Sequence, residues 1–96
     1  MSKNKVTKEQ IDKIMSGVTY HVYRVPDTTT TVAVAYSEDG FRLAVGASDC
    51  VDPANYDFEL GKKYACERAE HDARNKLWEL EGYHLFKSLQ ESANNK

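Results

Sequence analysis

A stripe of small side chains in the second half of the chain constrains the fold more than any other feature. Small residues recur at every fourth position, where a helix places them on one face. They are Gly61, Ala65, Ala69 and Ala73, and Leu77 and Leu80 continue the face. Small side chains let a helix axis come close to its neighbour. We therefore predict one long helix that presents this stripe to the rest of the domain. It begins after a cap at Asp52, Asn55 or Asp57 and runs to about Glu81.

The region before this helix alternates apolar and polar residues, as β-strands with one buried face do. The alternation runs over residues 18–25, 29–36 and 41–47. Turn sequences separate the three segments, Pro26-Asp27-Thr28 and then Ser37-Glu38-Asp39-Gly40. We expect an antiparallel meander. One face of its second strand should hold Val32, Val34 and Tyr36, and one face of its third should hold Phe41, Leu43, Val45 and Ala47.

A helix-start signal precedes the strands. Thr7 followed by Gln10 is a capping box, and Ile11, Ile14 and Met15 give the following turns an apolar face. The predicted fold is therefore α+β: a short N-terminal helix, a three-stranded antiparallel β-meander, and a long C-terminal helix packed on one face of the sheet. Residues 1–5 and 91–96 are predicted to be disordered tails around a single domain of residues 6–90.

The predicted long helix exceeds the sheet that it covers. Its twenty-five or so residues span about 37 Å, whereas strands of seven or eight residues span about 25 Å. We expect Gly82 to bend or stop the helix, and an apolar cluster of Tyr83, Leu85, Phe86 and Leu89 follows. That cluster either folds back on the core or offers a surface to a partner. The candidate partner-binding residues are Trp78, Tyr83, Phe86 and Leu89, and the overhang predicts a homo-oligomer formed through the long helix.

Composition bounds the classes of function. The 96 residues carry 13 Lys and Arg against 15 Asp and Glu, a formal net charge of −2. A sequence-independent nucleic-acid binder relies on clustered cations instead. No apolar run approaches the roughly 20 residues of a membrane span. We therefore expect one soluble, intracellular domain with no membrane partner.

The sequence lacks a recognisable metal or catalytic pattern. The metal-ligand candidates are Cys50, Cys66, His21, His71 and His84, without the close-spaced pairs of structural zinc sites. Cys66 lies within the predicted helix, and Cys50 is surrounded by the carboxylates of Asp49, Asp52, Asp57 and Glu59, which raise a thiol pKa. Those carboxylates suit a helix start, and a cation site or a phosphate mimic is the alternative. We expect free thiols, no metal, no cofactor and no enzymatic activity.

The order of elements resembles that of the double-stranded-RNA-binding domain. Gly61-Lys62-Lys63-Tyr64-Ala65 is similar to the start of its last helix. However, Pro26-Asp27-Thr28 lacks the Gly-Pro-x-His type of turn that such domains place in the minor groove. The alternative function is therefore a nucleic-acid or nucleotide binding module. It would use an exposed sheet face with Lys62, Lys63, Arg68 and Arg74. However, neighbouring acidic residues offset the positive charge of the two lysines.

Two strings of residues resemble a known family. They are Cys50-Val51-Asp52-Pro53-Ala54-Asn55-Tyr56-Asp57 and Lys76-Leu77-Trp78-Glu79-Leu80-Glu81-Gly82-Tyr83, with Gly61-Lys62 between them. The family is the small tailed-phage protein family named after gene products of phages N4 and Sf6, and the resemblance spans about residues 6–85. It implies a phage origin and expression in the cytoplasm of the infected bacterial host, and it supplies no catalytic residues. We expect a non-enzymatic accessory protein that binds and modulates a host or phage protein during infection.

Overall fold

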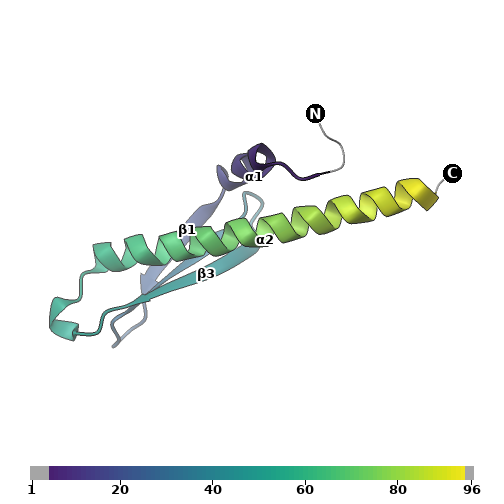
Figure 1. The fold of residues 1–96 in the computed structure, drawn as a ribbon. Helices are drawn as coiled ribbons and strands as arrows, with labels where there is room; N and C mark the ends of the chain where they lie inside the picture. Colours follow the sequence, from purple (N-terminus) through teal and green to yellow (C-terminus); the bar gives the residue numbers. More distant parts are fainter. Residues whose placement is uncertain (1–4, 95–96) are drawn as a thin grey trace.

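The computed structural model describes residues 5–94 of the chain. Its elements are α1 (Lys8–Met15), β1 (Thr19–Arg24), β2 (Thr30–Tyr36), β3 (Arg42–Asp49), the 3₁₀ turn η1 (Pro53–Asn55) and α2 (Phe58–Asn94). The strands form one antiparallel sheet in the order β1-β2-β3. The long helix α2 lies across one face of the sheet and extends past its end, with α1 beside it (Figure 1). The predicted α+β architecture is confirmed.

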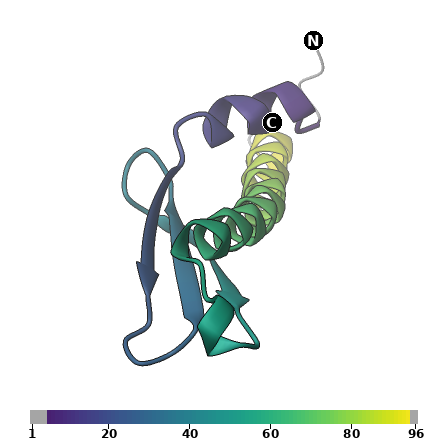
Figure 2. The ribbon, with the colours of Figure 1, turned by 90° about the vertical axis from the view of Figure 1, so that its left-hand side faces the viewer.

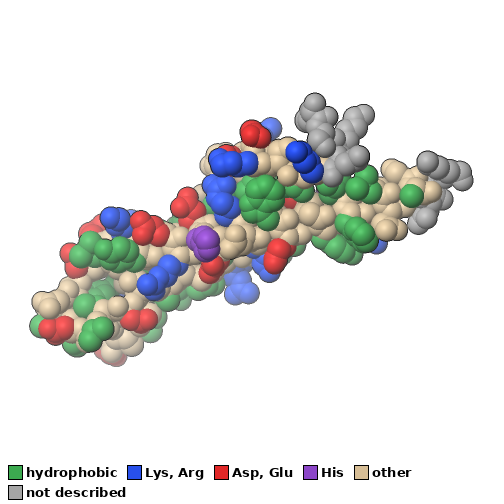
Figure 3. Space-filling view, viewed as in Figure 1, with side chains coloured by type: hydrophobic (Ala, Val, Ile, Leu, Met, Phe, Trp, Pro, Cys, Tyr) green, Lys and Arg blue, Asp and Glu red, His purple; other side chains and the backbone are tan. Residues whose placement is uncertain are grey.

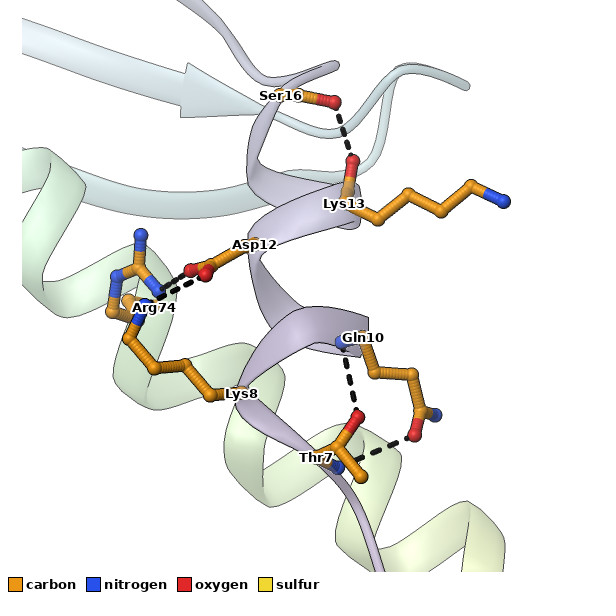
Figure 4. Close-up of polar contacts among 7 residues, drawn as sticks. All are labelled: Thr7, Lys8, Gln10, Asp12, Lys13, Ser16 and Arg74. Carbon is orange, nitrogen blue, oxygen red and sulfur yellow. Dashed lines mark hydrogen bonds and ion pairs between the residues drawn. The ribbon is translucent and has the colours of Figure 1, made fainter. Parts of the chain in front are cut away.

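The first helix begins at the predicted capping box (Figure 4). The Gln10 backbone N–H donates to Thr7 Oγ1 at 3.2 Å, and the Thr7 backbone N–H donates to Gln10 Oε1 at 3.3 Å. Ile11 is fully buried. Arg74 of α2 donates to Asp12 Oδ1 at 2.6 Å, while Lys8 donates to Asp12 Oδ2 at 2.7 Å. Apolar burial and an ion pair therefore both hold α1 against α2.

Two of the predicted capping residues are used ahead of α2. Asp52 caps η1 by accepting a hydrogen bond from the Ala54 N–H at 3.0 Å. Asp57 then accepts from the Glu59 N–H at 3.0 Å, and α2 begins at Phe58. The predicted helix end is wrong, because α2 runs through Gly82 and past residue 90 to Asn94. One glycine costs a helix only about 1 kcal/mol, which the strong helix formers on both sides of Gly82 offset.

The small-residue stripe of α2 packs directly on the sheet. Ala65, Ala69 and Ala73 are fully buried. Opposite them on β3, a Cβ added to Gly46 would lie 2.5 Å from the Ala69 nitrogen and would also overlap the Ala65 carbonyl oxygen. A Cβ added to Gly61 would likewise overlap the side chain of Thr31 on β2. The backbones of helix and sheet therefore approach so closely that only small side chains fit between them.

This close approach decides which side chains face α2. On β2 the covered residues are Thr31, Ala33 and Ala35, all fully buried. The larger Val32, Val34 and Tyr36 share a face, as predicted, but alternation places them on the opposite side. Figure 2 shows that no other element of residues 5–94 lies over that side of the sheet.

The predicted alternation of the third strand is wrong. The pairing of β2 with β3 shifts between Ala35 and Tyr36, the mark of a β-bulge. A bulge inserts an extra residue and changes the side to which later residues point. Leu43 is consequently buried, whereas Val45 is 47% exposed. The two residues do not share a face.

Candidate functional site

The second half of α2 extends beyond the sheet. Burial of apolar side chains along α2 ends at Leu77, and we call residues 78–94 the overhang. The predicted partner-binding residues Trp78, Tyr83, Phe86 and Leu89 all belong to it, and all four are exposed. The molecule measures 66 × 22 × 21 Å. Its radius of gyration is 17.6 Å, against about 12.5 Å for a compact chain of this length.

Most apolar residues of the overhang share one side of the helix. Spacings of three, four, seven and eight residues return to the same side. The resulting overhang face consists of Trp78, Gly82, Leu85, Phe86, Leu89 and Ala93. At about 100° per residue, the charged residues of the overhang fall outside it, and so do Leu80 and Tyr83. Figure 3 shows hydrophobic side chains over both halves of the molecule, with fewer charged side chains over the second half of α2.

Gly82 lies within the overhang face without a role inside one chain. Its backbone is helical, and a Cβ added there would meet nothing within 4 Å. Alanine at this position would favour the helix by about 1 kcal/mol. Neither backbone conformation nor packing within the described chain therefore requires a glycine here.

A second uncovered apolar surface lies on the far side of the sheet. This open sheet face consists of Tyr23, Val32, Val34, Tyr36, Val45 and Ala47. Cross-strand pairing places Tyr23 beside Val32, Val32 beside Ala47, and Val34 beside Val45. The charged residues on this side, Arg42 and Asp49, stand at the two ends of β3. The middle row of the face holds Val34 between His21 and Val45, and no Lys, Arg, Asp or Glu of the three strands stands in that row.

A shallow hollow marks one end of the open sheet face. Its lining consists of Thr19, His21, Tyr23, Val34, Tyr36, Ser37, Glu38 and Gly40. The His21 and Tyr36 rings pack edge to face, with their centroids 5.3 Å apart. Such a hollow can receive an apolar or aromatic side chain of a partner, which is how the central residues of protein interfaces are usually anchored.

The sequence showed that Val32, Val34 and Tyr36 share a face, but not that this half-buried row lies on the side of the sheet away from α2. Alternation shows which residues share a face, and it does not show which face is covered. The signal that could have settled the matter is side-chain size. A helix stripe of glycine and alanine fits against Ala33 and Ala35, and it has no room for Val32, Val34 or Tyr36.

The candidate nucleic-acid-binding residues do not come together. At about 100° per residue, Lys62, Lys63, Arg68 and Arg74 point to three different sides of α2. Arg68 donates to the Ala47 carbonyl oxygen of β3 at 2.5 Å, and Arg74 is paired with Asp12. Lys63 has Glu59 and Glu67 at i−4 and i+4. Two of the four cations therefore serve the fold, and the four do not form one positive stripe.

The acidic group before α2 serves local structure. Asp49 accepts a hydrogen bond from the Thr30 hydroxyl at 2.5 Å, while Asp52 and Asp57 cap η1 and α2. Within residues 5–94, no three His, Cys, Asp or Glu side chains gather closely enough to hold a metal ion.

Both cysteines are free thiols. Cys50 donates to the Asp52 carbonyl oxygen at 3.1 Å. Burial raises the pKa of the Cys66 thiol, and nearby Lys62 only partly opposes that shift. A raised pKa favours the protonated form, whereas a nucleophilic cysteine needs the thiolate.

The fold and its surfaces together define a small α+β protein with two apolar surfaces that no other described element covers. Its polar side chains described above cap helices or link one element to another. Among the described residues, no helix is both long and apolar enough to cross a membrane. The chain belongs to the Phage protein (N4 Gp49/phage Sf6 gene 66) family, whose model matches residues 6–89. No curated protein and no solved structure matches it. The resemblance read from the two residue strings is confirmed, and this is a phage protein.

Proposed function

We propose that this phage protein is a non-enzymatic accessory protein. It binds a host or phage protein in the cytoplasm of the infected bacterium and alters the activity of that protein. The observation that carries the proposal is the open sheet face, where large apolar side chains lie on the uncovered side of the sheet. A chain that only had to fold would gain by placing such residues in its core, because burial of a valine or leucine contributes about 1.5–3 kcal/mol.

The chemistry of the open sheet face indicates what kind of partner it fits. Its centre is formed by Val32, Val34 and Val45, with Tyr23 and Tyr36 beside them. Interfaces between proteins have apolar centres depleted of charge and rich in aromatic residues. A nucleic-acid interface needs cations directed at phosphates, and here the charged Arg42 and Asp49 stand at the ends of one strand. These features favour a protein partner with an apolar surface.

The test is capture of partners from infected host cells by the tagged full-length chain, with and without nuclease. We expect one protein in stoichiometric amount, unaffected by nuclease. Val45→Lys should abolish that recovery, because it places a charge at the centre of the open sheet face. Val51→Lys is the matched control, since Val51 is a fully exposed valine outside the face. It should leave recovery unchanged.

Two outcomes would contradict the proposal. Recovery of material that nuclease removes would favour the nucleic-acid alternative, and Lys62 and Lys63 would then be the residues to replace. Equal recovery by Val45→Lys and Val51→Lys would show that the open sheet face is not the binding surface. Far-ultraviolet circular dichroism of both variants checks that each retains the wild-type fold.

A further inference from the structure

We propose that the overhang face binds a second copy of this chain, with the two α2 helices packed antiparallel and crossing at Gly82. This inference concerns a surface other than the open sheet face and does not depend on the proposed function. It follows from three observations: the accessible area of the chain, the self-complementary arrangement of the face, and the unexplained glycine at its middle.

The solvent-accessible area of the chain is larger than that of a compact monomer of the same mass. It exposes 7021 Å², whereas a compact monomer of this mass exposes about 5,600 Å². The ninety residues 5–94 would expose about 5,300 Å² as a compact domain, and the six residues outside that range about 1,000 Å² if fully extended. About 700 Å² of the accessible area is left over, close to the approximately 800 Å² that each partner buries in a standard protein interface.

The order of residues along the overhang face suits a two-fold axis. A symmetric dimer uses the same patch on both copies, so large side chains must meet gaps on an identical surface. Gly82 and Phe86 lie one helical turn apart. In an antiparallel pair centred midway between them, Phe86 of each copy stands opposite Gly82 of the other. Trp78 of each copy then lies beside Leu89 of the other. The face is therefore complementary to itself.

Gly82 supplies the space that this pairing needs. Within residues 5–94 nothing approaches its missing side chain within 4 Å. Two other glycines stand at the contact between α2 and the sheet: Gly46 lies against the backbone of α2, and Gly61 lies against the side chain of Thr31. A crossing at Gly82 would repeat that arrangement between two helices. It would also cover Trp78, Phe86 and Leu89 of the overhang face, which are exposed in one chain.

The test measures the mass of the full-length chain from micromolar to several hundred micromolar by sedimentation equilibrium. This method is required because an elongated monomer elutes early from a sizing column. We expect the mass of two chains at the upper end of the range. Leu89→Glu should weaken association at least about a hundredfold, because it buries an unpaired charge.

Leu80→Glu is the matched control for that variant. Leu80 is 40% exposed and Leu89 is 44% exposed. Nine residues of helix separate them, so they point to opposite sides of the overhang. Leu80→Glu should associate like the wild type. A wild-type chain that stays a single copy at the highest concentration would overturn the proposal, and so would equal effects of the two glutamates.

Gly82→Ala tests the crossing itself. A methyl group at the contact should weaken association about tenfold by overpacking, although alanine is the better helix former. Association as tight as that of the wild type, or tighter, would overturn a crossing at Gly82. Loss of the dimer in Val45→Lys would instead assign self-association to the open sheet face. Leu89→Glu should still capture the partner protein, because that binding is proposed for the open sheet face. This result keeps the test of self-association separate from the test of the proposed function.

Discussion

The two halves of α2 use apolar residues in opposite ways. From Phe58 to Leu77 the helix meets the sheet through glycine and alanine, and these small residues are buried. From Trp78 to Asn94 it carries large apolar residues, and Trp78, Leu80, Tyr83, Phe86 and Leu89 are exposed. The difference shows that side-chain size, rather than hydrophobicity alone, distinguishes the part of α2 that packs on the sheet from the part that stays exposed.

The largest effect is expected from Gly46→Ala, which acts on the sheet-bound half. The added methyl group would overlap the Ala65 carbonyl oxygen and approach the Ala69 nitrogen to 2.5 Å. Backbone atoms cannot move aside as a flexible side chain can, so we expect a loss of about 3 kcal/mol in the free energy of unfolding. Urea denaturation of dilute protein measures it. A loss below about 0.5 kcal/mol, the range of neutral surface changes, would mean that α2 is not seated on β3.

Effects of intermediate size are expected when glycine is replaced by alanine in each half of α2, at Gly61 and at Gly82. Alanine in place of helical glycine gains about 1 kcal/mol from helix propensity. At Gly61 the methyl group would overlap Thr31, which is fully buried with its hydroxyl 2.8 Å from that of Tyr56. We expect Gly61→Ala to lose about 1–2 kcal/mol overall.

At Gly82 the same change meets open space. Dilute, monomeric Gly82→Ala should therefore gain up to about 1 kcal/mol in the free energy of unfolding. Thermal or urea denaturation well below the concentration of association measures both variants. Shifts of the same sign for Gly61→Ala and Gly82→Ala would remove the distinction between the two halves.

The smallest effect concerns the boundary between the halves, where α1 docks. Hydrogen bonds from Lys8 and then from Arg74 lower the pKa of the Asp12 carboxyl below its ordinary value of 3.8. Because the pKa is lower in the folded state, the stabilisation is present above pH 3.8 and is lost as the pH falls through the lowered pKa.

Asp12→Asn should therefore lower the thermal midpoint slightly at neutral pH, since both side chains of the pair remain partly exposed to solvent, which weakens an ion pair. The difference from the wild type should vanish in acid. A difference that persists undiminished in acid would show that packing of α1, rather than the ion pair, is the cause.

The local features of this fold could be predicted from the sequence, and the non-local ones could not. Thr7 and Gln10 cap α1, and Asp57 caps α2, because each acts on backbone groups two or three residues away. The end of α2 was missed because Gly82 is a weak stop signal among strong helix formers. The bulge that separates Leu43 from Val45 depends on pairing with β2, which leaves no mark in the β3 sequence.

The same division applies to the candidate surfaces. The overhang of the long helix could be predicted from helix and strand lengths. Whether Tyr83, Phe86 and Leu89 fold back on the core or stay exposed could not, because the helix was expected to bend or stop at Gly82. The open sheet face required the distance between α2 and the sheet, which becomes visible only when Gly46 is seen against Ala65 and Ala69. The roles of Arg68 and Arg74 were hidden because their partners, Ala47 and Asp12, lie far away in the sequence.

The hydrogen bond from Arg68 to the Ala47 carbonyl oxygen also bears on how the protein avoids uncontrolled assembly. β3 lies at the border of the sheet, and its outward-facing backbone groups could template an additional strand. The Arg68 guanidinium already binds one of the carbonyl oxygens that an additional strand would need as a hydrogen-bond acceptor. It also places a positive charge where that strand would have to lie. This protection opposes growth of the valine-rich sheet into a fibril-like ladder at that border, so contacts through its flat side can form without polymerisation there.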